Sequence, residues 1–180
     1  MSISLERFEL SDVDRLTEIM QANIEAAGRT KDYKKFIEWN LEHPEDLYWK
    51  IVLRTESPDI SFESGSDSSL KSSEFFIGYI GFAQASTKLT TRDFAGPKDL
   101  FLEIYLDPEY TGKGYGEEAF KASLKRLPRD TRRIYASTYI SNVKAQRFFI
   151  SKLGMKVLCR NKKYNVVILS SRDGVVLTTP

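Results

Sequence analysis

FLEIYLDPEYTGKGYGEEAF, residues 101–120, combines a strand pattern, a glycine-rich loop and the start of a helix. Residues 101–106 alternate between a uniformly apolar face and a mixed face, which is typical of a β-strand. Asp107-Pro108-Glu109 ends the strand, because proline cannot donate a hydrogen bond to a central ladder. A helical pattern then begins at Glu117. The order strand, glycine loop, helix is the centre of the predicted fold.

Three glycines define the loop. Gly112, Gly114 and Gly116 alternate with Lys113 and Tyr115. Glycine lets the main chain approach a bulky group closely and adopt angles that side chains disfavour. The unpaired N–H groups at the start of a helix also make a suitable anion site, above all for phosphates. A glycine-rich turn without a ligand fits the same short pattern, so the loop alone leaves both interpretations open.

Length and composition predict one globular domain over residues 1–180. The apolar fraction is 41%, the charged fraction is 29% and the net charge is +2, which is too small to indicate a nucleic-acid partner. No apolar run approaches membrane-spanning length, and the N-terminus lacks the pattern of a signal peptide. We therefore expect a cytoplasmic protein that does not bind membranes.

The chain has a single cysteine, Cys159, and a single histidine, His43. One cysteine excludes an internal disulfide and a cysteine metal cluster, so we predict no metal site. His43 precedes Pro44 at the expected end of a helix, which favours a surface position over a catalytic one. No nucleophile-elbow pattern accompanies it, so a Ser-His-Asp site is not predicted.

The rest of the chain predicts a mixed α/β sheet with helices on both faces. The expected order is a strand, two helices, three strands, a helix, a strand, a helix and two strands. The second helix, about 31–42, carries Trp39 away from its main apolar stripe. This side chain either packs under the first helix, which is the favoured interpretation, or lines a substrate cleft. Residues 55–73 are rich in serine and predict a mobile hairpin loop. Residues 172–180 add a possible edge strand.

Two motifs carry a family resemblance. Thr111-Gly112-Lys113-Gly114-Tyr115-Gly116 is similar to a Gln/Arg-x-x-Gly-x-Gly/Ala loop between a strand and a helix. A second motif, Asn-x-x-Ala-x-x-apolar-Tyr-x-Lys-x-Gly-Phe, is matched with its spacing intact by Asn142, Ala145, Phe148, Phe149, Lys152, Gly154 and Met155. In this order, the two motifs resemble the GNAT superfamily of N-acetyltransferases. The resemblance implies a twisted, mostly antiparallel sheet of six to seven strands.

The resemblance also implies a cosubstrate, acetyl-CoA. Its diphosphate would lie over the N–H groups of residues 112–116, where Lys113 is either a phosphate contact or a solvated side chain. The pantetheine arm would pair with the backbone of residues 104–106. The implied cofactor-binding residues are Ile104, Tyr105, Leu106, Thr111, Gly112, Lys113, Gly114, Tyr115, Gly116, Asn142, Phe149 and Lys152.

Two positions depart from the family pattern. Thr111 stands where Gln or Arg is usual, which the backbone contacts should tolerate. Phe149 stands where a tyrosine often protonates the departing thiolate, and it has no hydroxyl. Tyr139 and Tyr105 are the alternative hydroxyls, although each also fits a packing role. The Leu106 N–H is a candidate donor to the thioester carbonyl.

Acetyl transfer requires a neutral amine, and an alkyl ammonium has an ordinary pKa of about 10, so a base is needed. Glu103 is the first candidate, because it is an acid in a hydrophobic strand close to the glycine loop. A surface-facing or salt-bridged strand residue is the alternative interpretation. The predicted function is N-acetylation of a primary amine of a small molecule or peptide by a monomer or homodimer.

The sequence pattern also raises two other interpretations. A non-catalytic acyl-CoA-binding or regulatory module would keep the same fold, and Phe149 keeps this alternative open. Nucleotide-binding loops fit less well. The P-loop requires Gly-x4-Gly-Lys-Ser/Thr, and the dinucleotide fingerprint requires a glycine where Glu117 stands.

Overall fold

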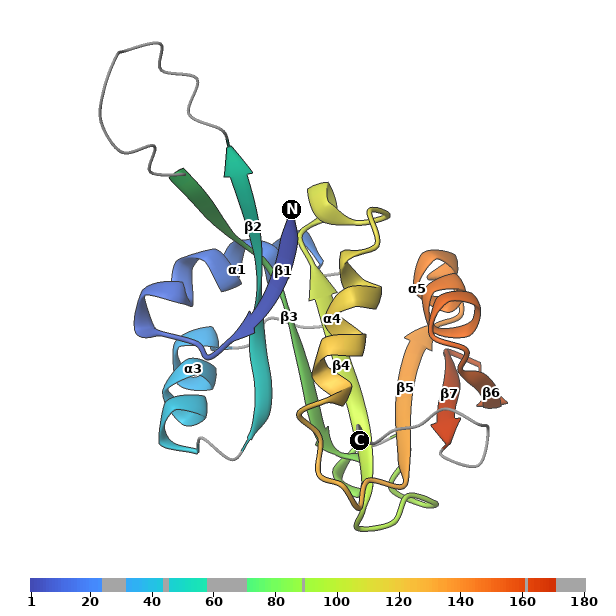
Figure 1. Cartoon of the computed structure of the whole chain (residues 1–180). Coiled ribbons are helices and arrows are strands. Elements are labelled where there is room, and N and C mark those ends of the chain that lie inside the picture. The colour runs from blue at the N-terminus through green and yellow to red at the C-terminus, as the bar shows by residue number, and fades with distance from the viewer. Residues whose placement is uncertain (24–31, 44–45, 58–70, 89, 161, 171–180) are drawn as a thin grey trace, which may run out of the picture.

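A computed structural model describes residues 1–23, 32–43, 46–57, 71–88, 90–160 and 162–170. Figure 1 shows how these residues are arranged. The order of the principal elements is β1 (Ser2–Glu6), α1 (Val13–Ala22), α3 (Tyr33–Glu42), β2 (Leu47–Ser57), β3 (Lys71–Gln84), β4 (Asp99–Leu106), α4 (Tyr115–Leu124), β5 (Arg133–Tyr139), α5 (Val143–Arg147), β6 (Lys156–Arg160) and β7 (Tyr164–Ser170). The predicted order of strands and helices is confirmed.

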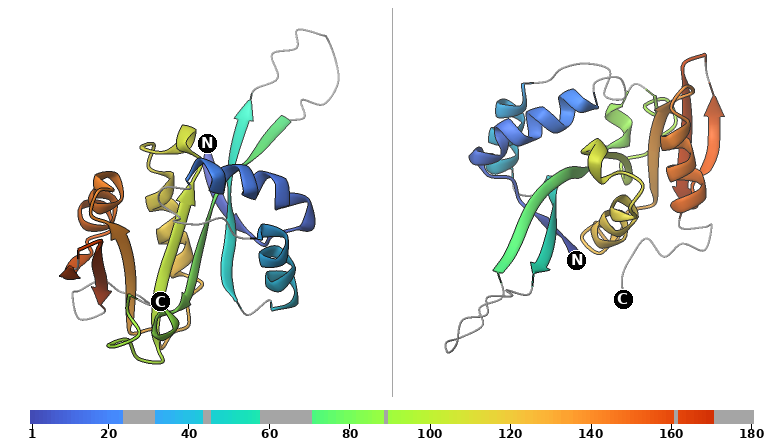
Figure 2. Two further views of the ribbon diagram at one scale, coloured as in Figure 1. Left: turned by 180° about the vertical axis from the view of Figure 1, so that it is seen from behind. Right: turned by 90° about the horizontal axis from the view of Figure 1, so that it is seen from above.

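The strands form one twisted sheet (Figure 2). It has seven strands in the order β1-β2-β3-β4-β5-β7-β6 within the described residues. Every neighbouring pair is antiparallel except β4 and β5. This confirms the predicted mixed, mostly antiparallel sheet of six to seven strands.

The parallel pairing of β4 with β5 is short. It runs from Asp99 opposite Arg133 to Phe101 opposite Tyr135. Beyond Phe101, β4 continues to Leu106 and β5 continues to the end of its own range, but the two strands separate (Figure 1). A β-strand offers hydrogen-bonding groups along both edges. The outer part of β4 therefore has an edge available for a ligand.

Helices cover both faces of the sheet, as predicted. On one face, Leu16 of α1 and Ile37 of α3 are buried in a cluster that includes Tyr79 of β3. On the other face, Phe120 of α4 is buried with Phe149, which follows α5. The right-hand view of Figure 2 shows α1 and α3 on the side of the sheet opposite α4. The apolar stripes of the helices bury these side chains against the sheet.

The predicted loop 55–73 is too long at both ends. Thr55–Ser57 continue β2 and Lys71–Ser73 continue β3, with Thr55 opposite Ser73. A ladder needs only backbone groups, so a run of polar residue types does not end it. Residues 58–70 lie outside the described part of the chain. The tail 172–180 lies outside it too.

The prediction for Trp39 is wrong. Its side chain is 54% exposed rather than packed under α1. The indole ring stacks on His43 with centroids 3.7 Å apart, and its N–H donates to Asp46 at 2.7 Å. An aromatic partner and a carboxylate acceptor thus satisfy this residue at the surface. The surface position predicted for His43 agrees with this arrangement.

The second motif contains one residue more than its predicted spacing. A Tyr-x-Lys-x-Gly pattern starting at Phe149 would end at residue 153, whereas the glycine is Gly154. The structure accommodates the extra residue in a π-helical turn, Phe148–Lys152. There the N–H of Leu153 donates to the carbonyl of Phe148, five positions earlier, at 3.0 Å. Phe149 and Met155 both remain buried despite the insertion.

Gly78 is required for the close approach of β3 to β4. A Cβ at this position would lie 2.3 Å from the carbonyl oxygen of Tyr105 and 2.9 Å from the Cα of Leu106. We expect Gly78→Ala to lower the free energy of unfolding by about 1–3 kcal/mol, because the two strands must move apart. Urea denaturation measures the change. The control is Gly96→Ala, whose Cβ would have its nearest neighbour at 3.6 Å, and an equal effect of both variants would contradict the prediction.

Candidate active site

A cleft of about 1230 Å³ opens where β4 and β5 separate. Its floor and walls come from the outer parts of these two strands, the glycine loop, the first turn of α4, and α5 with its π-helical turn. Asn23 from the end of α1, Lys88 from the segment after β3 and Tyr164 of β7 complete the lining. The cleft thus joins the two predicted motifs, which are separate in sequence.

The residues of β4 alternate in the edge to which their N–H and C=O groups point. The N–H of Asp107 donates to a carbonyl of β3 at 2.8 Å, and the carbonyl of Tyr105 lies against Gly78 of β3. Because the N–H and C=O groups of successive residues point to opposite edges of a strand, those of Ile104 and Leu106 face the cleft. These are the backbone groups that the family resemblance assigns to the pantetheine arm.

The glycine loop presents bare main chain to the cleft. Gly112 and Gly114 have positive φ angles of 77° and 92°, and Gly114 is the N-cap of α4. A Cβ at either position would meet nothing within 4 Å. Gly116 differs, since its Cβ would lie 3.2 Å from the ring of Phe148. Gly112 and Gly114 therefore leave open space beside the N-terminus of α4, while Gly116 lets α4 pack against Phe148 of the π-helical turn.

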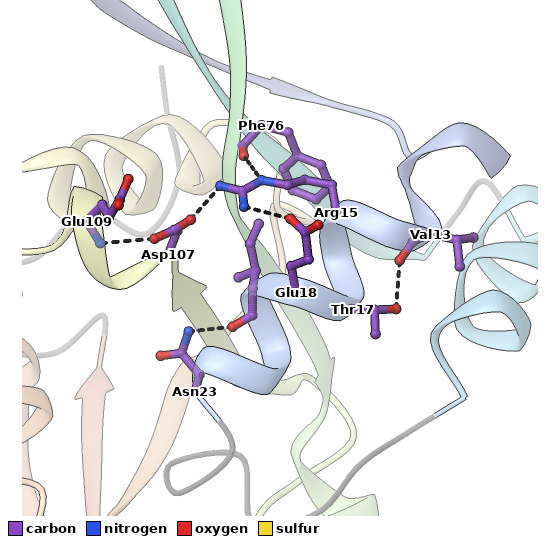
Figure 3. A network of polar contacts seen from close by, with 9 residues as sticks. Val13, Arg15, Thr17, Glu18, Asn23, Phe76, Asp107 and Glu109 are labelled. Atoms are coloured by element: carbon purple, nitrogen blue, oxygen red, sulfur yellow. Dashed lines mark hydrogen bonds and ion pairs between the residues drawn. The ribbon is translucent and has the colours of Figure 1, made fainter.

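A polar network fixes the junction between β4 and this loop (Figure 3). Arg15 of α1 donates to the carbonyl of Phe76 at 3.0 Å and pairs with the Asp107 carboxylate at 2.5 Å. The same carboxylate accepts the N–H of Glu109 at 3.0 Å, where the chain turns toward the glycines. Charge-assisted hydrogen bonds of this kind are stronger than neutral ones. The network therefore holds the start of the loop against α1 and β3.

Asn23 ties the end of α1 to the cleft-facing edge of β4. Its side-chain amide donates to the carbonyl of Leu106 at 2.9 Å and to that of Ile19 at 2.8 Å. The same peptide edge carries the Leu106 N–H, the candidate oxyanion donor. Asn23 is therefore placed to hold that edge in position.

Glu103 lies inside the cleft rather than on an exposed surface. Its side chain is 12% exposed and forms an ion pair with Lys88, which is 28% exposed. The Lys88 ammonium also lies 5.6 Å from the centroid of the Phe101 ring. Of the two sequence interpretations, the structure shows a salt-bridged residue that also lines the predicted site.

The two alternative hydroxyls lie in different surroundings. The Tyr105 ring packs 5.4 Å from that of Tyr79, in the aromatic cluster under α1 and α3. The Tyr139 ring lies 4.9 Å from that of Tyr164 at the mouth of the cleft. A hydrogen bond between these last two hydroxyls raises the pKa of Tyr139 and lowers the pKa of Tyr164. The Lys163 ammonium lies 5.3 Å from both rings.

The second motif forms the wall opposite β4. The Asn142 side chain accepts the N–H of Ala145 at 3.0 Å and so caps α5 while lining the cleft. Phe149 is buried, with its ring 5.4 Å from that of Phe148. Lys152 is exposed at the rim. This wall supplies apolar surface with cationic side chains at its edge, including Lys144 and Arg147.

The structure brings most of the predicted residues to one place. Those that line the cleft are Glu103, Ile104, Tyr105, Leu106, Thr111, Gly112, Gly114, Gly116, Tyr139, Asn142, Phe149 and Lys152. Lys113 and Tyr115 are outside this lining. The Lys113 ammonium lies 5.3 Å from the Tyr110 ring, against which the Tyr115 ring also packs. The two interpretations of Lys113, a phosphate contact and a solvated side chain, both stay predictions.

Sequence reasoning did not single out several of the lining residues, among them Asn23, Lys88 and Tyr164. Asn23 and Lys88 follow a helix and a strand, and only the tertiary fold brings them to β4. Tyr164 had a usable signal, because it lies opposite Tyr139 in the register of β5 and β7. A register can be read from a hairpin pattern only after the pairing strands are known.

One buried tyrosine, Tyr79, and two partly buried ones, Tyr48 and Tyr105, predict a loss of stability at alkaline pH. Burial raises the pKa of Tyr48, Tyr79 and Tyr105, and the charge of Glu103 raises each of them further. In the unfolded chain, these groups ionise near their ordinary pKa of about 10. Above that pH, the unfolded chain binds fewer protons than the folded one, so the free energy of unfolding falls as the pH rises.

Urea denaturation between about pH 8 and about pH 11 measures this loss. Tyr48→Phe and Tyr105→Phe should each make the decline less steep, because each removes one of the titrating groups. A free energy of unfolding that is independent of pH over this interval would contradict the prediction.

The described residues contain no group of three or more His, Cys, Asp and Glu side chains arranged to hold a metal ion. Within the same ranges, no helix has both the length and the apolar character needed to span a membrane. Cys159 is exposed on β6 and is not part of the cleft lining.

Comparisons with known proteins agree with this geometry. The search of curated protein sequences gives no match. Among solved structures, yncA from Salmonella typhimurium, with its cofactor acetyl-CoA, is 18% identical, with 94% of each chain covered and a TM-score of 0.64. The aminoglycoside acetyltransferase AAC(6')-Ib, in complex with coenzyme A, is 15% identical, covering 95% of this chain and 96% of that one, with a TM-score of 0.67.

A third neighbour is RimL, the ribosomal L7/L12 alpha-N-protein acetyltransferase. It is 14% identical, covering 94% of this chain and 91% of that one, with a TM-score of 0.62. At these identities, the similarity shows a shared fold. The sequence evidence is more direct, because residues 3–156 match the family model described as Acetyltransferase (GNAT) domain. The chain belongs to the GNAT family of acetyltransferases.

Proposed function

We propose that the protein is an N-acetyltransferase that moves the acetyl group of acetyl-CoA directly to a primary amine of a small molecule or peptide. One observation carries this proposal. The cleft-facing edge of β4 leads from the open space at Gly112 and Gly114 to a buried carboxylate, Glu103. Such an edge suits an arm that contains amides, and such a space at a helix N-terminus suits a diphosphate, for which it would form a cradle.

The cradle would bind the diphosphate through backbone N–H groups. Bare main chain and positive φ angles at Gly112 and Gly114 leave room for the phosphate oxygens. Lys144, Arg147 and Lys152 at the rim can add positive charge to the same end of the cleft. Thr111 also lines the cleft, which supports the view that its replacement of Gln or Arg is tolerated.

The arm would then run along β4 toward Phe101. With the diphosphate at the loop end, the Leu106 N–H meets the arm first and the Ile104 N–H meets it nearer the thioester. Either N–H can donate to an amide or thioester carbonyl, because both face the cleft. Asn23 already donates to the Leu106 carbonyl, so this peptide is oriented before a ligand arrives.

Direct transfer is proposed because the cleft contains no thiol that could carry the acetyl group. The only cysteine, Cys159, lies outside the lining. Glu103 would accept a proton from the amine, which then attacks the thioester carbonyl carbon. Bound acetyl-CoA supplies the acetyl group and a thiolate leaving group.

Protonation of the thiolate needs a donor other than Phe149. The Tyr139 hydroxyl lies in the cleft within a hydrogen-bonded pair with Tyr164, and the Tyr105 hydroxyl lies near Glu103 in the chain. A thiol has an ordinary pKa of about 8.5, so the thiolate leaves readily even with weak assistance. We propose Tyr139 as the donor, because it is the more open of the two to the cleft.

Two of the three named neighbours support the substrate class. One is an aminoglycoside acetyltransferase and the other is an alpha-N-protein acetyltransferase, so this fold serves both small-molecule and protein amines.

The non-catalytic alternative keeps its support from Phe149. A single experiment separates them: the purified protein is mixed with acetyl-CoA, a panel of primary amines and a thiol reagent. Thiol release that depends on an amine supports the enzyme, and CoA binding without release from any amine supports the module.

A further inference from the structure

Lys88 places a primary ammonium inside the cleft. Its backbone is held by the short 3-10 turn that follows β3, with its N–H donating to the carbonyl of Ala85 at 3.2 Å. Its own carbonyl accepts the N–H groups of Thr91 and Arg92 at 3.0 and 2.8 Å. From this fixed base, the side chain reaches β4 and pairs with Glu103.

The Lys88 ammonium lies beside the group proposed to act as the base. Glu103 is the candidate base, and the Lys88 ammonium also lies 5.6 Å from the Phe101 ring centroid. Phe101 is where the pairing of β4 with β5 ends and the cleft closes. An arm anchored at Gly112 and Gly114 and running along β4 would bring its thioester toward this closed end, because Phe101 and the glycine loop line opposite ends of the outer part of β4.

We propose that Lys88 is a modification site, acetylated by the acetyl-CoA bound in the same molecule. This inference rests on the proposed function, since it uses the same cosubstrate and the same base. The lysine side chain belongs to the class of acceptor that the site is proposed to take, a primary alkyl amine. The fold holds this amine beside the base, so no separate acceptor molecule has to bind once acetyl-CoA is in place.

The transfer is balanced as follows. Glu103 accepts one proton from the Lys88 ammonium and passes it to solvent. The neutral nitrogen forms a bond to the thioester carbonyl carbon, and the carbon–sulfur bond breaks. A second proton leaves the nitrogen and ends on the thiolate as free CoA thiol. The product is an amide without positive charge, so the ion pair between residue 88 and Glu103 is lost.

The test needs acetyl-CoA alone. The purified chain is incubated with acetyl-CoA and no amine, and acetylation of each lysine is followed by peptide mass spectrometry. We expect Lys88 to be acetylated at least about tenfold faster than exposed Lys98, since general base catalysis acts only in the cleft. The rate constant should not change with protein concentration, because the reaction is intramolecular.

Two variants make the test specific. Glu103→Gln should slow acetylation of Lys88 at least about tenfold while leaving that of Lys98 unchanged. Lys98→Arg, which changes a lysine paired with Asp130 at 3.1 Å, should leave acetylation of Lys88 unchanged. Acetylation of Lys88 no faster than that of Lys98, or equally fast in Glu103→Gln, would overturn the inference.

Failure of this inference can be told apart from failure of the proposed function. Thermal stabilisation by CoA and amine-dependent thiol release are measured on the same preparation. If both are present and Lys88 stays unmodified, the inference is wrong and the proposed function stands. If CoA gives no stabilisation and no lysine reacts faster than Lys98, both are wrong.

Discussion

Gly114→Val is expected to lower the affinity for CoA by roughly 100-fold or more, which corresponds to about 3 kcal/mol. Gly114 is the N-cap of α4 and has a positive φ angle of 92°. A valine side chain would enter the space in which a Cβ now meets nothing within 4 Å, and that space is the proposed path of the diphosphate. Losing two charge-assisted hydrogen bonds accounts for an effect of this size. Isothermal titration calorimetry with CoA measures it.

The matched control is Gly154→Val. Gly154 also has a positive φ angle, 68°, and a Cβ there would likewise meet nothing within 4 Å. Both variants therefore carry a similar backbone strain of about 1–2 kcal/mol, which urea denaturation records. Only Gly114 lines the cleft. If CoA affinity survived in Gly114→Val, or fell equally in both variants, the loop would not be the diphosphate site.

Glu103→Gln is expected to lower kcat roughly 100-fold, within the range that general base catalysis provides. The amide keeps the shape of the side chain but cannot accept the proton of the amine. For the same reason, the turnover of the variant should rise less with pH than that of the wild type. Steady-state kinetics across the pH range measure both effects, and CoA affinity should stay within about threefold of the wild type.

Asp130→Asn serves as the control for this variant. Asp130 is also paired with a lysine, Lys98 at 3.1 Å, but both side chains are more than half exposed. Breaking a surface ion pair costs little, so turnover should be unchanged. Unchanged turnover in Glu103→Gln would clear Glu103 of the base role. The carboxylate would then serve only to hold Lys88.

The main features of the fold could be predicted because they depend on local patterns. Alternation in 101–106, three glycines and the proline at 108 define β4 and its loop, and the structure reproduces this order. The second motif was recognised by its Asn142 and Gly154 ends. Its extra residue could have been counted in the sequence, whereas the π-helical turn that accommodates it depends on how Phe149 and Met155 fit the core.

Other features depend on contacts between distant residues. Arg15 and Asp107 are 92 positions apart, and nothing in either neighbourhood indicates their ion pair. Lys88 reaches Glu103 only because the turn after β3 brings the chain back along β4. The polar ends of the β2–β3 hairpin were predicted to be a loop. Residue composition indicates whether a segment can be buried, but it does not indicate whether its backbone pairs with another strand.

The short pairing of β4 with β5 has a mechanical consequence. Asp99–Phe101 and Arg133–Tyr135 are the only residues through which the β1–β4 half of the described sheet meets the β5–β7 half by strand pairing. A ligand bound in the cleft would contact both halves at once, because residues of β4 and of β5 line the cleft. Because such a ligand binds only when the two halves are in place, its binding free energy would add to the free energy needed to separate them. Tighter binding would therefore make the whole sheet more stable.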